Sequence, residues 1–207
     1  MSDQIKAVID ADFFIHVTEY EKGTRLFLQI MRDLNLSPVM HRFVADTELK
    51  NDPYLPALLN DRQLTVIDYE DYLSDDSDKQ EYAEYFRAAY ERLNRFPFPE
   101  GADIYKYAQP RENIGEIRSL YMAMKKNYAY FMSDDGGSRA LAKNFFSGKH
   151  RVNVNSLYDA LIQCKEQGTC MTWKDINPTV TNAMRSRQDR IDSLREMYRT
   201  KLNYFKP

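Results

Sequence analysis

The sequence lacks the features that mark secreted, membrane-spanning and zinc-stabilised proteins. Its 207 residues include only two cysteines, Cys164 and Cys170, which give neither a disulfide framework nor a zinc-binding pattern. No apolar run approaches the roughly 18 residues that a transmembrane helix needs. The first residues, MSDQIKAVIDADFF, lack the basic and then apolar pattern of a signal peptide. We therefore expect a cytoplasmic protein that does not contact a membrane.

The chain also lacks a large net charge of either sign. Its formal net charge is −2, and its hydrophobic fraction of 43% is ordinary for a globular protein. This near-neutral total does not exclude a nucleic-acid partner, because an acidic metal site can offset basic patches elsewhere. The 15 tyrosines are interpreted as packing residues rather than as an array for base stacking.

Apolar segments of the sequence predict strands that alternate with helices. We expect strands at residues 5–10, 38–40, 64–67, 128–133 and 152–154. We expect helices at residues 24–35, from 43 to a break near 51–53, and at 114–127, 138–146 and 156–167. This alternation predicts an α/β fold with a mostly parallel central sheet.

Two segments do not follow this alternation. Residues 70–112 combine an acidic stretch, an amphipathic helix and a proline-containing connection, which we interpret as a helical insertion or lid. Residues 180–205 are expected to form one long helix with an apolar stripe and arginine-rich outer faces. We therefore predict a main domain at residues 1–178 and a C-terminal helix within 179–207 that packs on this domain or on a partner.

Acidic residues follow two of the expected strands and open one of the expected helices. Asp10 ends the first strand, and Asp134 and Asp135 follow the strand at 128–133. Glu116 opens the helix that leads into that strand, so it belongs at the same sheet edge. Carboxylates gathered there would repel one another unless a cation neutralised them, and oxygen ligands favour Mg²⁺ or Mn²⁺. Each acid also has a simpler explanation, since Asp135, for example, can cap the following helix.

Successive motifs of this sequence resemble those of PIN-domain nucleases. The motifs are VIDADFFIH, VADTELK, IGEIRSLYMAM and FMSDDGGSRALAK. In one subgroup of that family, which includes toxin ribonucleases, a Gly-Glu pair opens a helix and an apolar strand ends in Asp-Asp. Gly115-Glu116 and Asp134-Asp135 match those pairs, and VNVNSLYDALIQCKEQGTCMTWKDI resembles the closing strand and helices. The match covers about residues 4–50 and 113–180 and implies a three-layer PIN-like domain.

The resemblance implies a metal-dependent nuclease that most often hydrolyses RNA. By position, Asp10, Glu116 and Asp135 would hold one or two Mg²⁺ or Mn²⁺ ions, with Asp134 as a close supporter. The ions would lower the pKa of an attacking water and stabilise the charged transition state. The secondary residues of this site are expected to be Asp12, Glu48 and Ser133.

Basic residues near the expected metal site are candidates for binding RNA phosphates. They are Arg139, Lys143, Lys149 and Arg151, and a solvated helix face is the alternative explanation. Many members of the family are toxins that an antitoxin inhibits. An antitoxin or other protein partner is therefore a candidate, as is a second copy of the chain.

Two departures from the family pattern leave other functions open. Asp12 replaces the usual asparagine, and Arg118 replaces a frequent second glutamate. A catalytically degenerate PIN-like module that binds nucleic acid or protein is the first alternative. A haloacid-dehalogenase-type phosphatase is the second, because Asp10-Ala11-Asp12 matches its D-x-D motif, although Phe14 does not fit. The histidines lie in no recognisable serine or cysteine context, so no nucleophilic triad is predicted.

Overall fold

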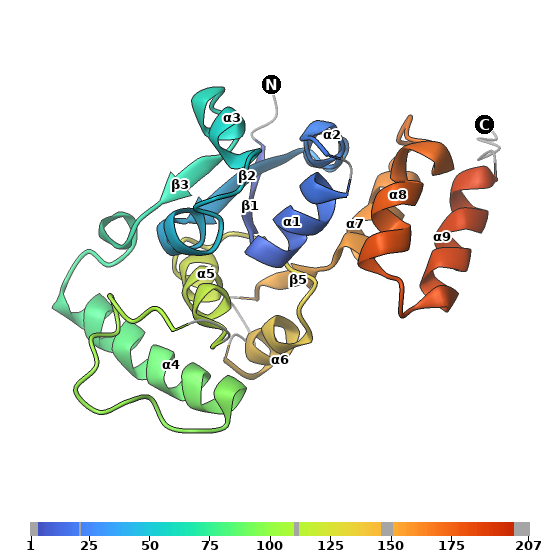
Figure 1. Ribbon diagram of the computed structural model, residues 1–207. Helices are drawn as coiled ribbons and strands as arrows, with labels where there is room; N and C mark the ends of the chain where they lie inside the picture. Colours follow the sequence, from blue (N-terminus) through green and yellow to red (C-terminus); the bar gives the residue numbers. More distant parts are fainter. Residues whose placement is uncertain (1–3, 21, 110–111, 146–150, 201–207) are drawn as a thin grey trace.

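A sheet of five parallel strands forms the centre of the molecule, with helices on both faces (Figure 1). The computed structural model describes residues 4–20, 22–109, 112–145 and 151–200. The strands are β1 (Ile5–Ile9), β2 (Leu36–His41), β3 (Thr65–Ile67), β4 (Tyr130–Met132) and β5 (Asn153–Asn155). Their order across the sheet is β3-β2-β1-β4-β5. The predicted α/β class is confirmed, and the sheet is entirely rather than mostly parallel.

Each predicted strand is present, and helices connect them. The helices are α1 (Ala11–Glu19), α2 (Arg25–Asp33), α3 (Leu55–Asn60), α4 (Asp76–Asn94), α5 (Ile114–Lys125), α6 (Gly136–Phe145), α7 (Leu157–Glu166), α8 (Trp173–Ala183) and α9 (Gln188–Arg199). A π-helical segment, Val44–Glu48, replaces the helix expected from residue 43. Two short helices, α1 and α3, were not predicted from the sequence.

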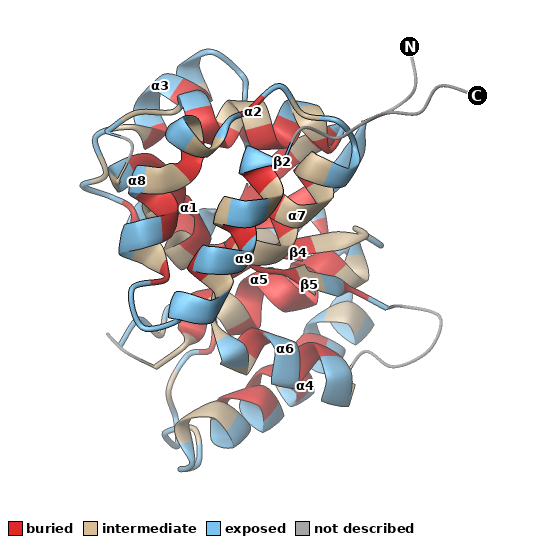
Figure 2. Ribbon diagram, turned by 90° about the vertical axis from the view of Figure 1, so that its right-hand side faces the viewer, coloured by how far each residue is buried: buried red, intermediate tan, exposed pale blue. Residues whose placement is uncertain are grey.

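Side chains of the central strands alternate between two hydrophobic cores. Ala7 and Ile9 of β1 belong to the core that contains residues of α1, α2 and α7. Val8 between them belongs to the core shared with α4, α5 and α6. This period of two is what a strand buried on both faces requires. Figure 2 shows the buried residues through the middle of the molecule, with exposed residues on the outer helices.

The strand order changes direction at β1. The chain adds β2 and β3 on one side of β1, whereas β4 and β5 lie on the other side. The ends of β1 and β4 therefore adjoin: Ile9 is paired with Met132, and the Asp10 N–H donates to the Met132 carbonyl at 3.0 Å. In open α/β sheets, ligands bind outside the carboxyl ends of the strands at this reversal point.

The segment 70–112 packs against α5 as part of a core. Tyr82, Phe86 and Tyr90 of α4 are fully buried. The Tyr82 and Tyr121 rings meet edge to face, with 5.0 Å between their centroids. Such aromatic contacts continue into the loop after α4, where Phe98 and Tyr107 lie 4.8 Å apart. Most of the tyrosines in this region are thus packing residues.

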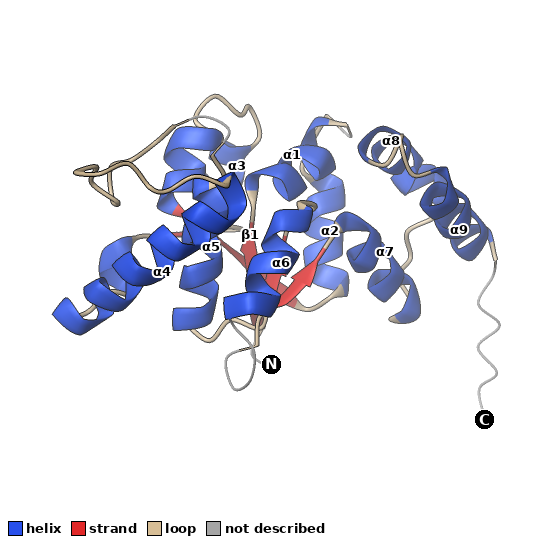
Figure 3. Ribbon diagram, turned by 90° about the horizontal axis from the view of Figure 1, so that it is seen from below, coloured by secondary structure: helices blue, strands red, loops and turns tan. Residues whose placement is uncertain are grey.

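The C-terminal region differs from the single long helix expected at 180–205. α8 and α9 are separate and form a hairpin beside α7, at the opposite end of the molecule from α4 (Figure 3). Both helices turn apolar side chains toward one core, since Val180 of α8 and Leu194 of α9 are fully buried in it. One straight helix could not place both on α1 and α7. The boundary predicted between residues 178 and 179 lies inside α8, and residues 201–205 lie outside the described ones.

None of the helices in the described residues is both long and apolar enough to span a membrane.

Candidate active site

Asp10 follows β1 directly and is only 1% exposed. Among the described residues, neither of its carboxylate oxygens has a hydrogen bond of ordinary geometry, and only the nearby Ser133 hydroxyl acts to lower its pKa. Burial raises the pKa of Asp10 well above its usual range, and the negative charges of Glu116, Asp12 and Glu48 raise it further. A buried carboxylate that lacks partners is costly, so this position calls for either a proton or a cation.

Two glutamates from other elements, Glu116 and Glu48, lie close enough to Asp10 to raise its pKa. Glu116 lies in the first turn of α5, and Glu48 ends the π-helical segment. Burial raises the pKa of the Glu116 carboxyl to about 7, with a further increase from the charges of Glu48 and Asp135. The pKa of Glu48 is also raised to about 7, mainly because protein surrounds its carboxylate, although the side chain keeps contact with solvent.

Gly115 makes room for the Glu48 carboxylate. An added Cβ on Gly115 would lie 2.7 Å from Glu48 Cδ, closer than real Cβ contacts. The Gly-Glu pair at residues 115–116 therefore contributes in two ways: Gly115 leaves space for the Glu48 carboxylate, and Glu116 supplies a carboxylate of its own. Asn113, just before α5, adopts a left-handed backbone with φ 53°, which asparagine tolerates better than most residues.

Asp12 connects the first turn of α1 to the segment after β4. Its carboxylate accepts hydrogen bonds from the Phe13 N–H at 2.5 Å and the Asp134 N–H at 3.0 Å. Burial and the neighbouring Asp134 charge raise the pKa of Asp12 to about 6. Asp12 thus adds negative charge beside Asp10 and also holds the carboxyl ends of β1 and β4 together.

Asp134 lies at the predicted edge, but both of its oxygens are engaged. One accepts a hydrogen bond from the Leu157 N–H at 2.7 Å, and the other lies 2.6 Å from His16 Nδ1. The bond to Asp134 raises the pKa of His16. Asp134 thus fixes the start of α7 and orients His16, and its predicted role at a metal ion stays a prediction. The sequence analysis assigned no role to His16, although its spacing of four residues places it on the same face of α1 as Asp12.

Asp135 and Ser133 shape the start of α6. Asp135 accepts a hydrogen bond from the Gly137 N–H at 3.0 Å, so the simpler explanation as a helix cap applies. Ser133 is fully buried, and its hydroxyl accepts the Asp135 N–H at 3.2 Å. The Asp135 charge nevertheless raises the pKa of Glu116, so the two carboxylates lie near each other.

The carboxylates match a hard cation in chemistry but do not form a ready coordination site. Among the described residues, no three His, Cys, Asp or Glu side chains are grouped closely enough to bind one metal ion together. Asp10, Asp12, Glu48 and Glu116 are nonetheless near enough for the last three to raise the pKa of the first. Oxygen ligands of this kind suit Mg²⁺ or Mn²⁺. Such an ion would have to draw the side chains inward by rotamer changes.

The predicted basic cluster does not gather beside these acids. Arg139 is at the acidic edge, in the first turns of α6, and forms an ion pair with Asp159. Lys143 lies about 6 Å further along α6, at 1.5 Å per residue. Arg151 precedes β5, whose first residue pairs with the first residue of β4, so it lies at the opposite edge of the sheet. Lys149 lies outside the described residues.

Arg118 has a structural role. It is 1% exposed, and its guanidinium donates to the carbonyls of Ile104 and Tyr107 at 2.9 and 2.8 Å. It also lies 4.0 Å from the centroid of the Phe43 ring. Arg118 thus ties the loop after α4 to α5. Its position in an apolar helix face gave no signal of this role, because the partners are backbone carbonyls.

Two pockets flank the acidic residues. The first pocket, of about 300 Å³, includes Phe43, Glu48 and Glu116 in its lining. The second pocket, of about 140 Å³, has Asp134 and Asp135 on its wall. Its arginine side is formed by Arg139, Arg187 and Arg190.

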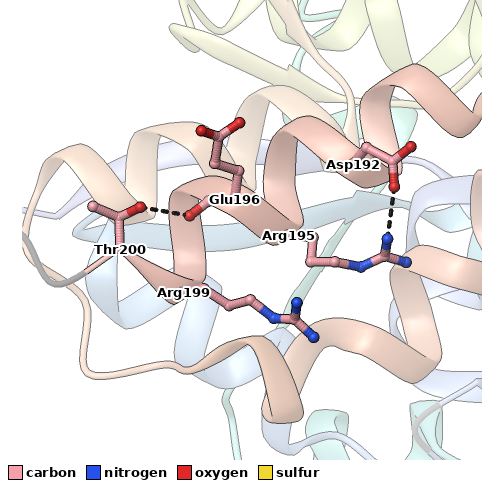
Figure 4. Close-up of a pocket in the computed structure, with 5 residues that line it drawn as sticks. All are labelled: Asp192, Arg195, Glu196, Arg199 and Thr200. Carbon is pink, nitrogen blue, oxygen red and sulfur yellow. Dashed lines mark hydrogen bonds and ion pairs between the residues drawn. The ribbon is translucent and has the colours of Figure 1, made fainter.

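A third hollow lies away from the acids along one side of α9 (Figure 4). It is lined by residues of the last turns of that helix, including Arg195 and Arg199. Arg195 donates to Asp192 at 2.7 Å within the same helix. This surface has no part in the acidic site.

Comparisons with known proteins add no assignment: no family model, curated protein or solved structure matches the chain.

Proposed function

We propose that the protein is a Mg²⁺- or Mn²⁺-dependent endoribonuclease with a PIN-like fold. The observation that carries the proposal is Asp10, a buried carboxylate that has no hydrogen bond of ordinary geometry among the described residues and lies next to three further acids. Its place at the reversal point of the strand order supports a ligand site there. The resemblance of the acidic motifs to PIN-domain nucleases supplies the reaction class.

In the proposed site, some acids would hold the ion and others would position the backbone. Asp10, Glu116 and Asp135 would hold the ion, and Glu48 would approach it over Gly115. Asp12 and Asp134 position the chain segments that carry these ligands, through hydrogen bonds to backbone N–H groups. A divalent ion would supply an activated water and charge stabilisation for phosphodiester hydrolysis. The antitoxin and homodimer partners stay predictions.

The test compares the wild type with Asp10→Asn on a mixed RNA pool in Mn²⁺. The substitution keeps the shape of the side chain and removes one negative ligand, so cleavage should fall at least about 100-fold, as expected on loss of a group that holds charge in the transition state. Asp61→Asn is the matched control, because Asp61 is exposed and lies at the end of α3. It should cleave like the wild type.

A thermal shift in Mn²⁺ separates the proposal from its alternatives. The wild type should be stabilised by Mn²⁺ and Asp10→Asn should not, because only the wild type gains from neutralising the acids. A degenerate binding module would bind RNA without Mn²⁺ stabilisation or cleavage. Release of phosphate from a generic phosphomonoester, with intact RNA, would instead favour the phosphatase reading.

A further inference from the structure

We propose that the second pocket, beside Asp135, binds the RNA phosphate next to the scissile one, and that Arg187 and Arg190 of the C-terminal hairpin are its main ligands. This inference rests on the proposed nuclease function. Both arginines line the same pocket as Asp134 and Asp135, so a phosphate held there would lie close to the acidic site. The hairpin would thereby belong to the substrate site and not only to the core.

The two arginines are available for an anion. Among the described residues, no carboxylate forms an ion pair with either guanidinium. Arg190 lies over the Tyr158 ring, 5.0 Å from its centroid, which orients the guanidinium without neutralising it. Arg187 is exposed immediately before α9. By contrast, Arg139 in the same wall is already paired with Asp159.

Two backbone N–H groups beside this pocket are already occupied by protein carboxylates. The N–H of Leu157 at the start of α7 donates to Asp134, and the N–H of Gly137 in α6 donates to Asp135. These two groups are therefore not free for an anion. The arginine side chains provide the positive charge of the pocket, and their planar guanidinium groups match phosphate oxygens.

Pocket size and position favour phosphate over a larger group. The volume of about 140 Å³ is below the roughly 300 Å³ typical of sites for drug-sized ligands. The first pocket, of about 300 Å³, opens on the other side of the acids at Glu48 and Glu116. A strand of RNA that crosses the acidic edge could thus place one phosphate among the arginines and a nucleoside in the larger pocket.

The experiment measures binding of a labelled single-stranded RNA to Asp10→Asn protein in Mn²⁺, so that cleavage does not interfere. Arg187→Ala and Arg190→Ala, each added to this background, should weaken binding about tenfold, the loss expected for one charge-assisted contact. Each should also reduce the slope of log affinity against log salt by about 0.7. Arg199→Ala, on the same helix but outside the pocket, is the matched control and should change neither quantity.

Folding and function are controlled separately. Arg187 is exposed, so Arg187→Ala should retain the wild-type melting temperature even if Arg190→Ala disturbs the contact with Tyr158. A variant that carries both Arg187→Ala and Arg190→Ala in the Asp10→Asn background completes the test. If its RNA affinity and salt slope are unchanged, the inference is overturned. If the wild type cleaves RNA, that result leaves the nuclease proposal intact. Arginine-dependent RNA binding without any cleavage would support the pocket and refute the nuclease.

An acidic protein segment is the rival occupant. Polyglutamate is the probe: if its binding depends on Arg187 and Arg190 while RNA binding does not, the pocket belongs to an acidic protein partner and the inference is wrong.

Discussion

The Asp10 carboxylate loses its hydration on folding and gains no hydrogen bond of ordinary geometry among the described residues in return. A buried carboxylate of this kind lowers the stability of the metal-free protein, because removal of an unpaired ion from water costs several kcal/mol even after relaxation. A bound cation would offset this cost. The same side chain therefore sets both the stability of the metal-free state and the affinity for the ion.

Asp10→Asn should stabilise the metal-free protein while abolishing the response to metal. At pH 8 we expect the free energy of unfolding to rise by about 1–3 kcal/mol, because the buried charge is removed. Urea unfolding in a chelator measures this change, and Asp61→Asn should leave it unaltered. A destabilised Asp10→Asn protein would mean that the Asp10 carboxylate has a partner that stabilises it.

Gly115→Ala should separate stability from metal binding. The added methyl group would displace the Glu48 carboxylate, a flexible end that can move at little cost. Alanine gains about 1 kcal/mol of helix propensity over glycine, so stability should be unchanged or slightly higher. The Mn²⁺ affinity, measured by calorimetry, should fall about tenfold, equivalent to about 1.4 kcal/mol. Unchanged affinity would exclude Glu48 from the ion's surroundings.

At the scale of elements, α4 and the loop after it determine where α5 begins. The Asn113 amide donates to Asn94 at the end of α4, and Asn94 donates to the Glu112 carbonyl. Arg118 fixes the same loop one turn further along α5. The described part of segment 70–112 thus positions Glu116, and its role as a lid stays a prediction.

Arg118→Met should release the loop from α5. The substitution leaves the Ile104 and Tyr107 carbonyls without their donor, at about 1–3 kcal/mol for each group that stays buried. We expect a lower melting temperature and faster proteolysis between residues 95 and 112, measured against Arg92→Met on the exposed face of α4. Equal protease sensitivity in the two variants would show that the loop is held by its aromatic contacts alone.

The α8–α9 hairpin should be indispensable for folding. Truncation before Val180 would cut α8 and remove Leu194 and Tyr198 from the main core. Each buried apolar side chain contributes about 1.5–3 kcal/mol, so the loss approaches the 5–15 kcal/mol of a whole domain. The truncated chain should be insoluble or lack cooperative unfolding by circular dichroism. A folded, soluble product would instead make the hairpin an appendage.

At the scale of the whole molecule, the acidic site couples stability to pH. The pKa of Asp12 is raised to about 6 and that of Glu116 to about 7. Ordinary values near 4 apply in the unfolded chain. The folded metal-free protein therefore binds more protons than the unfolded one, and stability falls as pH rises from about 4 to about 7. Glu48 contributes less because it stays in contact with solvent.

Urea unfolding of the wild type and Glu116→Gln at pH 5 and pH 8, in a chelator, isolates this coupling. The wild type should lose about 1–3 kcal/mol more than Glu116→Gln between the two values, since one pKa unit corresponds to about 1.4 kcal/mol. Mn²⁺ should stabilise the wild type more at pH 8 than at pH 5, because the ion binds deprotonated carboxylates. An equal loss in the two proteins would place the pH dependence elsewhere.

The sequence by itself determined the strands and the acids that follow them. Burial on both faces requires continuous apolar runs, so IKAVID and YAYFMS were recognisable as strands, with Asp10 and Asp134 at their ends. The prediction of one helix at 180–205 was wrong. Apolar residues do recur at helical spacing there, but such spacing does not reveal that the chain turns back between α8 and α9.

Only the tertiary structure decided which acids remain free to bind an ion. Asp10 and Asp134 look alike in sequence, yet the Asp134 carboxylate bonds to His16 and Leu157, while the Asp10 carboxylate has no hydrogen bond of ordinary geometry among the described residues. The placement of Arg187 and Arg190 in the same pocket as Asp134 likewise depends on the packing of the hairpin. Local patterns encode which residues are buried, whereas hydrogen-bond partners come from segments far apart in the chain and are fixed only when these segments pack together.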